Sequence, residues 1–224
     1  MMATRFLILL VTLVFLASGI ALASPSNSQK LLTRALPETC SFSGEFKQKR
    51  FVRSIPAPLN SKGQFFFSCH KGLIWYTASP IEEWLIYGKN GEQFRADKHQ
   101  EYSSIDSRLH SYFASFLLRL LSADTEYLNK NFSIIEKEDE QNDDRFSLVL
   151  KPASKRLQRA LKSIELVESA KQKELIVSTH SGDKTQVVIS NTISYPVNRH
   201  SNLSNDCSDV FTVDNSACDR LNQQ

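Results

Sequence analysis

Apolar and polar side chains alternate along much of the first third of the chain. Phe42, Gly44 and Phe46 alternate with polar residues, and Phe65 and Phe67 follow the same period of two. This period is typical of strands that bury one face. Because segments rich in Pro, Gly and Asn separate the runs, the pattern predicts an antiparallel meander.

The same pattern recurs further along the chain, where it is interrupted once. Runs at 73–78, 83–87, 132–137, 145–150, 163–168, 174–179 and 185–191 predict further strands. From Leu109 to Leu121, apolar residues instead recur every three or four positions, which indicates an amphipathic helix. A shorter helix is predicted at 28–36, where Pro37 ends it. Such a helix either packs fully against the sheet or leaves a cavity above a concave sheet, and composition does not decide between the two.

The N-terminal segment indicates export. An apolar run over 6–17 follows a basic residue and leads into Ala21-Leu22-Ala23, a small-x-small pattern after which signal peptidase cuts. We therefore predict a cleaved signal peptide over 1–23 and a periplasmic location. A membrane anchor is the alternative, but the run is shorter than the roughly 20 residues that span a bilayer. No cysteine stands near the cut to carry a lipid.

Charge points to no particular partner. The formal net charge of +3 is too small to favour nucleic acid binding. The acidic stretch 136–144 is interpreted as a solvated hairpin tip. A basic cluster is interpreted as solvated surface, with contact to an anionic headgroup or membrane surface as the alternative. It consists of Lys151, Lys155, Arg156, Arg159 and Lys162.

Four cysteines indicate two disulfides, because an even number in an exported protein favours pairing over chemistry. None forms a C-x-x-C motif. Of the three possible pairings we expect Cys40 with Cys69 and Cys207 with Cys218, since each joins neighbouring segments. The tail over 195–224 is expected to be irregular and tied by the second disulfide.

No motif for catalysis or for metal binding is present. The histidines are scattered without ligand spacing, and they are His70, His99, His110, His180 and His200. Cys69 and His70 are neighbours on a predicted strand, so their side chains point to opposite faces and form no nucleophile–base pair. Nucleophile elbows and phosphate-binding loops are also missing. We predict no enzyme activity, no catalytic residue, no metal and no cofactor.

The order of short motifs resembles the LolA-like family of outer-membrane lipoprotein carriers. The motifs are GEFKQK at 44–49, PLNSKG at 58–63, GLIW at 72–75, SLVLKP at 147–152 and SGDKT at 181–185. The resemblance extends over 28–192. It implies a mainly β (α+β) fold, an unclosed antiparallel β-barrel with helices capping its concave apolar face. One carrier domain over 24–224 is expected.

The resemblance also implies a site and a role. The implied concave wall, here called the predicted wall, consists of Phe46, Phe65, Phe67, Trp75, Leu85, Phe146, Leu148 and Leu150. The implied lid consists of Phe113, Phe116, Leu117 and Leu120. The chain would carry an acylated lipoprotein or glycolipid from an inner-membrane exporter to an outer-membrane acceptor. It would act as a monomer, touching the membrane surface transiently.

Two departures from the family leave undecided which cargo is carried and which contact closes the lid. The main carriers have an arginine before the tryptophan-bearing strand, thought to hold the lid closed, where this chain has Cys69. The 58–63 and 72–75 motifs look more like divergent members associated with export of glycolipids or polyene lipids.

A half-barrel sensor that binds a signalling protein under envelope stress is the alternative function. A membrane-anchored acceptor is disfavoured by the missing lipidated cysteine.

Overall fold

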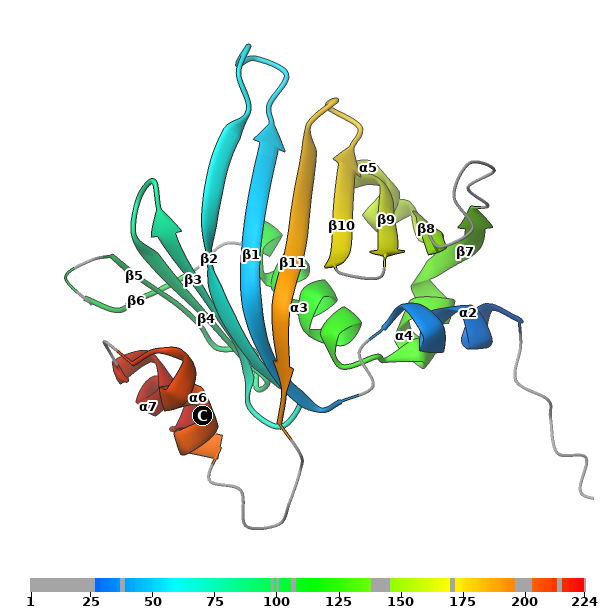
Figure 1. The fold of residues 1–224 in the computed structure, drawn as a ribbon. Helices are drawn as coiled ribbons and strands as arrows, with labels where there is room; N and C mark the ends of the chain where they lie inside the picture. Colours follow the sequence, from blue (N-terminus) through cyan, green and yellow to red (C-terminus); the bar gives the residue numbers. More distant parts are fainter. Residues whose placement is uncertain are drawn as a thin grey trace, which may run out of the picture.

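The computed structural model describes residues 27–36, 39–97, 99, 101–105, 108–137, 146–169, 172–195, 203–212 and 215–223, so the predicted signal peptide lies outside the described part. One sheet of eleven strands dominates it, in the order β6-β5-β4-β3-β2-β1-β11-β10-β9-β8-β7. All pairings are antiparallel. The sheet curves around helix α3 (Figure 1). These features confirm the predicted fold class.

The strands are β1 Ser41–Phe51, β2 Leu59–Ser68, β3 Gly72–Ser79, β4 Glu83–Gly88, β5 Gln93–Asp97, β6 Ser103–Ser104, β7 Phe132–Lys137, β8 Phe146–Pro152, β9 Leu161–Ser169, β10 Gln172–Thr179 and β11 Lys184–Ser194. The helices are α2 Asn27–Ala35, α3 Arg108–Leu121, α4 Thr125–Asn131, α5 Lys155–Ala160, α6 Leu203–Val210 and α7 Ser216–Asn222. Within the described residues, no helix is long and apolar enough to cross a bilayer.

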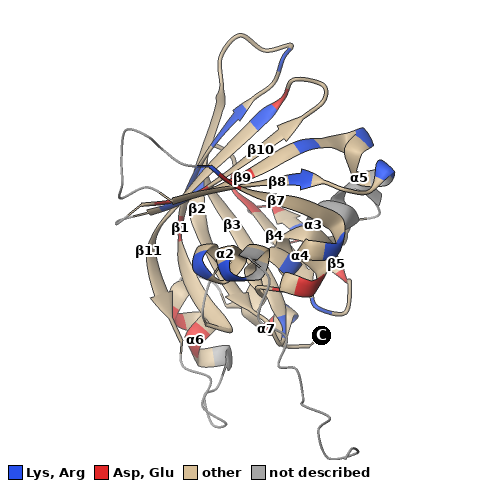
Figure 2. Cartoon of the chain, turned by 90° about the vertical axis from the view of Figure 1, so that its right-hand side faces the viewer, with Lys and Arg blue, Asp and Glu red and all other residues tan. Residues whose placement is uncertain are grey.

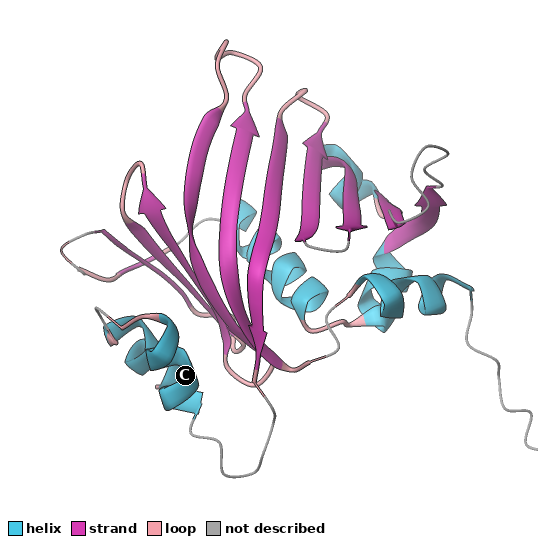
Figure 3. Ribbon diagram, viewed as in Figure 1, coloured by secondary structure: helices cyan, strands magenta, loops and turns pink. Residues whose placement is uncertain are grey.

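Two meanders build the sheet. The first runs from β1 to β6 and the second from β7 to β11, and β1 pairs with β11 to join them. Helices α3 and α4 connect β6 to β7, and α3 lies across the concave face (Figure 3). Strands β6 and β7 are the two edges of the sheet. The barrel is therefore unclosed, and helices occupy the space that further strand pairing would take.

Register sets which side chains share the concave face. Phe65 pairs with Trp75 and Trp75 with Leu85, so the three side chains stand side by side. The rings of Phe46 and Trp75 stack with centroids 3.9 Å apart. Gly63 makes room for them, since a Cβ there would lie 1.8 Å from the Tyr76 carbonyl oxygen and 3.0 Å from the Phe46 ring. The stacking of Phe46 on Trp75 thus requires glycine at position 63.

Side chains at the alternate strand positions point to the convex face and form a second hydrophobic core there. This convex core contains Phe66, Ile74, Trp84 and Ile86, and helices α6 and α7 cover it (Figure 1). The Phe211 ring, directly after α6, meets the Trp84 ring edge-on with centroids 5.2 Å apart. The prediction of an irregular C-terminal tail is therefore wrong. Helices this short are marginal alone, and packing on the sheet stabilises them.

Both disulfides join the cysteines in the expected pairs. Cys40 bonds to Cys69 with their Cα atoms 5.2 Å apart. This bond ties the segment before β1 to the turn between β2 and β3, where the Cys69 amide also donates to the Cys40 carbonyl at 2.8 Å. Cys207 bonds to Cys218 with Cα atoms 5.9 Å apart and ties α6 to α7.

Candidate functional site

A cavity lies between the concave face and α3. Its volume is about 430 Å³, within the range of pockets that hold a small molecule. Side chains from α3 and from seven strands line it, β1 to β4 on one side and β9 to β11 on the other. The helix therefore does not fill the trough, which decides between the two arrangements that the sequence left open.

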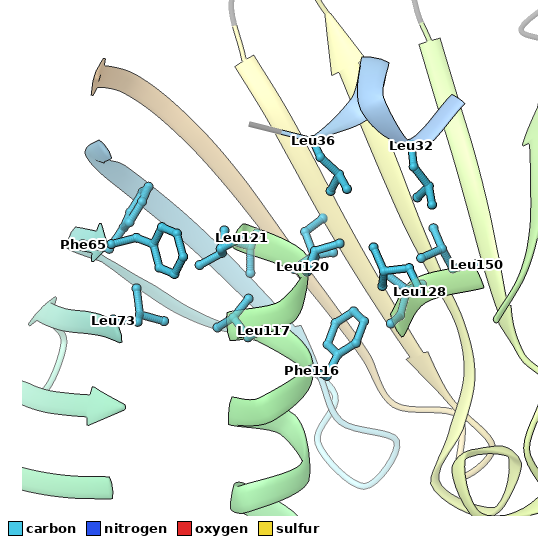
Figure 4. Packing of buried hydrophobic residues seen from close by; sticks show 14 of the residues in the cluster. Leu32, Leu36, Phe65, Leu73, Phe116, Leu117, Leu120, Leu121, Leu128 and Leu150 are labelled. Carbon is cyan, nitrogen blue, oxygen red and sulfur yellow. The ribbon is translucent and has the colours of Figure 1, made fainter. Parts of the chain in front are cut away.

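Helix α3 supplies one wall through a stripe of leucines. Leu117, Leu120 and Leu121 all line the cavity. Their spacing of three and four residues puts them on one face of the helix, and Figure 4 shows them pointing toward the sheet. Phe116 points elsewhere, and its ring lies 5.5 Å from that of Phe132 at the start of β7. Two predicted lid residues thus line the cavity, and a third fastens the helix to the sheet.

Three residues of the predicted wall line the cavity, namely Phe65, Trp75 and Leu85. The other five, Phe46, Phe67, Phe146, Leu148 and Leu150, are buried in the same hydrophobic cluster but are not among the lining residues. Helices α2 and α4 cover the β8 end of the trough: Leu32 of α2 and Leu128 of α4 lie beside Leu150 (Figure 4). The side chain of Phe113 is outside the described residues.

The cavity also has lining residues that sequence reasoning missed. They are on β9 to β11, across the cavity from Trp75, and include Leu166, Leu175, Val177, Val187 and Ile189. Alternation at 174–179 and 185–191 did predict these strands. Both faces carry aliphatic residues there, such as Ile176 beside Val177 and Val188 beside Val187. The pattern therefore gave no signal for which face turns inward.

Two ion pairs border the apolar lining. The Arg95 Nε lies 2.9 Å from the Glu83 Oε1, and the Lys173 Nζ lies 3.0 Å from the Glu168 Oε1. Glu83, Glu168 and Lys173 belong to the cavity lining. All these side chains remain between a quarter and a half exposed. The charges are therefore at solvent-accessible margins, and each already has an opposite charge as its partner.

Tyr87 is the polar group set deepest among the lining residues of β4. Its side chain faces the cavity and is only 4 % exposed. Burial raises the pKa of its phenol to about 12, to which the Glu83 charge adds and which the Arg95 charge opposes. The group is thus a neutral hydrogen-bond donor at any physiological pH. No described residue provides its hydroxyl with a hydrogen-bond partner.

The end of α3 is fixed by a polar corner. Asp124 caps α4, accepting a hydrogen bond from the Tyr127 amide at 2.9 Å, and it also pairs with Arg119 of α3 at 2.5 Å. Burial acts to raise the pKa of Asp124, but the Tyr127 amide and Arg119 together hold it below its ordinary value. Cys69, which stands where the main carriers have arginine, is engaged in its disulfide.

Reactive groups are scarce at this site. Among the described lining residues there is no histidine and no cysteine. One cluster of possible metal ligands is found in the described part of the chain, formed by Cys40, Cys69 and His70, and both of its sulfur atoms are in the disulfide. What the cavity can do chemically is to shield an apolar ligand from water.

Comparison with known proteins identifies the family of this chain. A family model described as outer membrane lipoprotein carrier protein LolA matches residues 38–200. No curated protein matches the sequence. Similar solved structures include a LolA superfamily protein from Nitrosomonas europaea, 10% identical with a TM-score of 0.44, covering 78% of this chain and 96% of that one. Another is a DUF1329 family protein from Desulfovibrio piger, 12% identical with a TM-score of 0.42, covering 76% and 92%. Because the family model spans well over half of the sequence, this chain belongs to the LolA family of outer membrane lipoprotein carriers.

Proposed function

We propose that this protein carries the acyl chains of a lipoprotein or glycolipid through the periplasm, from an inner-membrane exporter to an outer-membrane acceptor. The observation that carries the proposal is the cavity of about 430 Å³ between α3 and the concave face. Each methylene of an acyl chain that moves from water into the cavity stabilises the complex by about 0.8 kcal/mol. Transfer is then a physical step without covalent chemistry, and the protein is not an enzyme.

The hydrocarbon of the cargo is assigned to the apolar lining. Phe65, Trp75 and Leu85 would contact it from one side and Leu117 and Leu120 from the lid. The other five residues of the predicted wall and Phe116 of the lid would support this lining from within the same hydrophobic cluster. An apolar chain needs no charged partner there, which fits the margin positions of the two ion pairs.

Tyr87 supports a cargo with an acyl carbonyl over a bare hydrocarbon. The Tyr87 hydroxyl is a neutral donor within an otherwise apolar lining, and a hydrogen bond contributes about 0.5–1.5 kcal/mol, so its position favours a ligand that brings an acceptor. An ester or amide carbonyl next to an acyl chain is such an acceptor, and Tyr87 lines the same cavity as the apolar residues. We assign the carbonyl of the cargo to this hydroxyl.

Tyr87→Phe tests this assignment. The affinity for ethyl palmitate, measured by displacement of anilinonaphthalene sulfonate, should fall about fivefold to tenfold because one hydrogen bond is lost. Hexadecane has no carbonyl, so its affinity should stay the same. An equal change for both ligands would argue that Tyr87 only shapes the cavity.

The function itself is tested on protein purified from the periplasm of the cell that produces it. Extraction with organic solvent followed by mass spectrometry should yield an acylated molecule in near-stoichiometric amount, and its mass would identify the cargo. Repeated absence of lipid would count against the carrier. Binding of a signalling protein while the cavity is blocked would instead favour the envelope-stress sensor.

A further inference from the structure

At one end of the strands, an edge distinct from β6 and β7, the β1–β2 hairpin, the β10–β11 turn and α5 lie side by side and together carry many cations. The pairing of Phe51 with Lys184 places the β1–β2 hairpin beside the β10–β11 turn. The pairing of Thr179 with Leu161 places that turn beside α5. Figure 2 shows Lys and Arg at these turns. Segments distant in sequence therefore present their charge in one direction.

The β1–β2 hairpin is the most basic part of this edge. Residues 47–62 contain five Lys and Arg and no Asp or Glu, and all five cations are exposed. Four more exposed cations, Lys151, Lys155, Arg159 and Lys162, lie on α5 and the strand ends next to it. The basic cluster noted in the sequence is thus the continuation of a larger surface.

The same hairpin exposes large apolar side chains. Phe51 is 40 % exposed, Ile55 42 % and Leu59 49 %, three of the six large hydrophobic residues exposed in the described part of the chain. Neighbouring sheet strands stop short of this tip, which projects beyond the rest of the molecule (Figure 1). Apolar groups on a projecting tip contact little of the protein, so packing within this molecule does not explain them.

Acidic groups near this edge leave the hairpin cationic. Asp183 accepts a hydrogen bond from the Arg53 amide at 3.0 Å and is the one described acid in the hairpin, the β10–β11 turn and α5. Glu82, Glu83 and Asp97 belong to the adjoining β3–β5 part of the edge, where Glu83 pairs with Arg95. The positive field is therefore localised on the hairpin and α5.

We propose that the 47–62 hairpin and α5 dock this protein on an anionic phospholipid bilayer, with Phe51, Ile55 and Leu59 entering the boundary between headgroups and acyl chains. Cations beside exposed apolar side chains are the combination that an anionic bilayer surface binds. A bilayer surrounds a projecting tip, so all three side chains are buried together. The inference rests on the proposed function for its purpose, because a carrier must meet the membrane that supplies its cargo.

Cosedimentation with vesicles tests the docking without any cargo. Protein purified from the periplasm should bind vesicles of equal parts phosphatidylglycerol and phosphatidylcholine, bind vesicles of phosphatidylcholine alone at least tenfold more weakly, and lose the difference at high salt. The combined variant Phe51→Ser, Ile55→Ser, Leu59→Ser should lower the partition coefficient at least tenfold. These side chains are exposed, so the thermal unfolding midpoint should stay close to that of the wild type.

Ile193→Ser is the matched control. Ile193 is 58 % exposed near the other end of β11 and should leave vesicle binding unchanged. Wild-type protein that ignores anionic vesicles, or a hairpin variant that binds them as the wild type does, would overturn the inference. Vesicle binding by a protein that carries no extractable lipid would uphold the docking surface and contradict the carrier function, so the two failures are distinguishable.

Discussion

Val177→Asp is expected to abolish acyl-chain binding, whereas Ile176→Asp, one residue earlier on β10, is expected to leave it nearly intact. Both side chains are half-buried, and only Val177 lines the cavity. When an acyl chain covers position 177, a carboxylate there loses its water, and its cross-strand neighbours Thr185 and Ile164 offer it no opposite charge. An uncompensated buried charge costs about 3 kcal/mol or more, which corresponds to at least a hundredfold loss of affinity.

The two tryptophans provide the measurement. Trp75 lines the cavity, and Trp84 lies in the convex core, so Trp84→Phe leaves one reporter at the site. Titration with ethyl palmitate in that background should change the emission of Trp75 for the Ile176→Asp variant and leave it constant for Val177→Asp. Similar titration curves for both variants would show that the ligand binds elsewhere.

The strands and the lid helix were predictable because their patterns are local. Phe42 and Phe46 alternate with polar neighbours, and their strand packs one face on the cavity side. The helix over 109–121 differs from α3 by one residue, since its apolar stripe has the helical period over its whole length. The cysteine pairs followed from proximity along the chain, which the meander preserves in space.

Short elements and elements held by distant contacts were missed. Strand β5 is five residues long and α4 seven, too short for a periodic signal. Helices α6 and α7 depend on Trp84 and its neighbours on the convex face, more than a hundred residues earlier in the chain. No window of the tail sequence contains the surface that stabilises these helices.

The sequence predicted only part of the candidate site, because the rest depends on how distant helices dock on the sheet. Motif resemblance identified the concave face, and Trp75 and Leu117 do line the cavity. It could not show that α2 and α4 fill the trough over Leu148 and Leu150, because the docking of these helices is a tertiary event. Where the helices stop, the lining passes to aliphatic residues of β9 to β11. Cavity and packed core are thus two parts of one sheet face, separated by helix placement.

Phe211→Ala is expected to destabilise the fold while sparing ligand binding. The Phe211 ring is 3 % exposed and contacts the rings of Trp84 and Tyr76, at centroid distances of 5.2 and 6.3 Å. Removing such a buried ring costs about 3–5 kcal/mol. The cavity lies on the opposite face of the sheet, so the remaining folded protein should bind ethyl palmitate with unchanged affinity.

Urea unfolding followed by circular dichroism measures the stability of this variant, and Val210→Ala is its control. Val210 is the neighbouring residue, only half-buried, and its substitution should lower the free energy of unfolding by less than Phe211→Ala does. Equal losses for the two variants would mean that α6 does not depend on the aromatic contact. A loss of ligand affinity in folded Phe211→Ala protein would mean instead that the convex core sets the curvature of the sheet, and through it the width of the cavity.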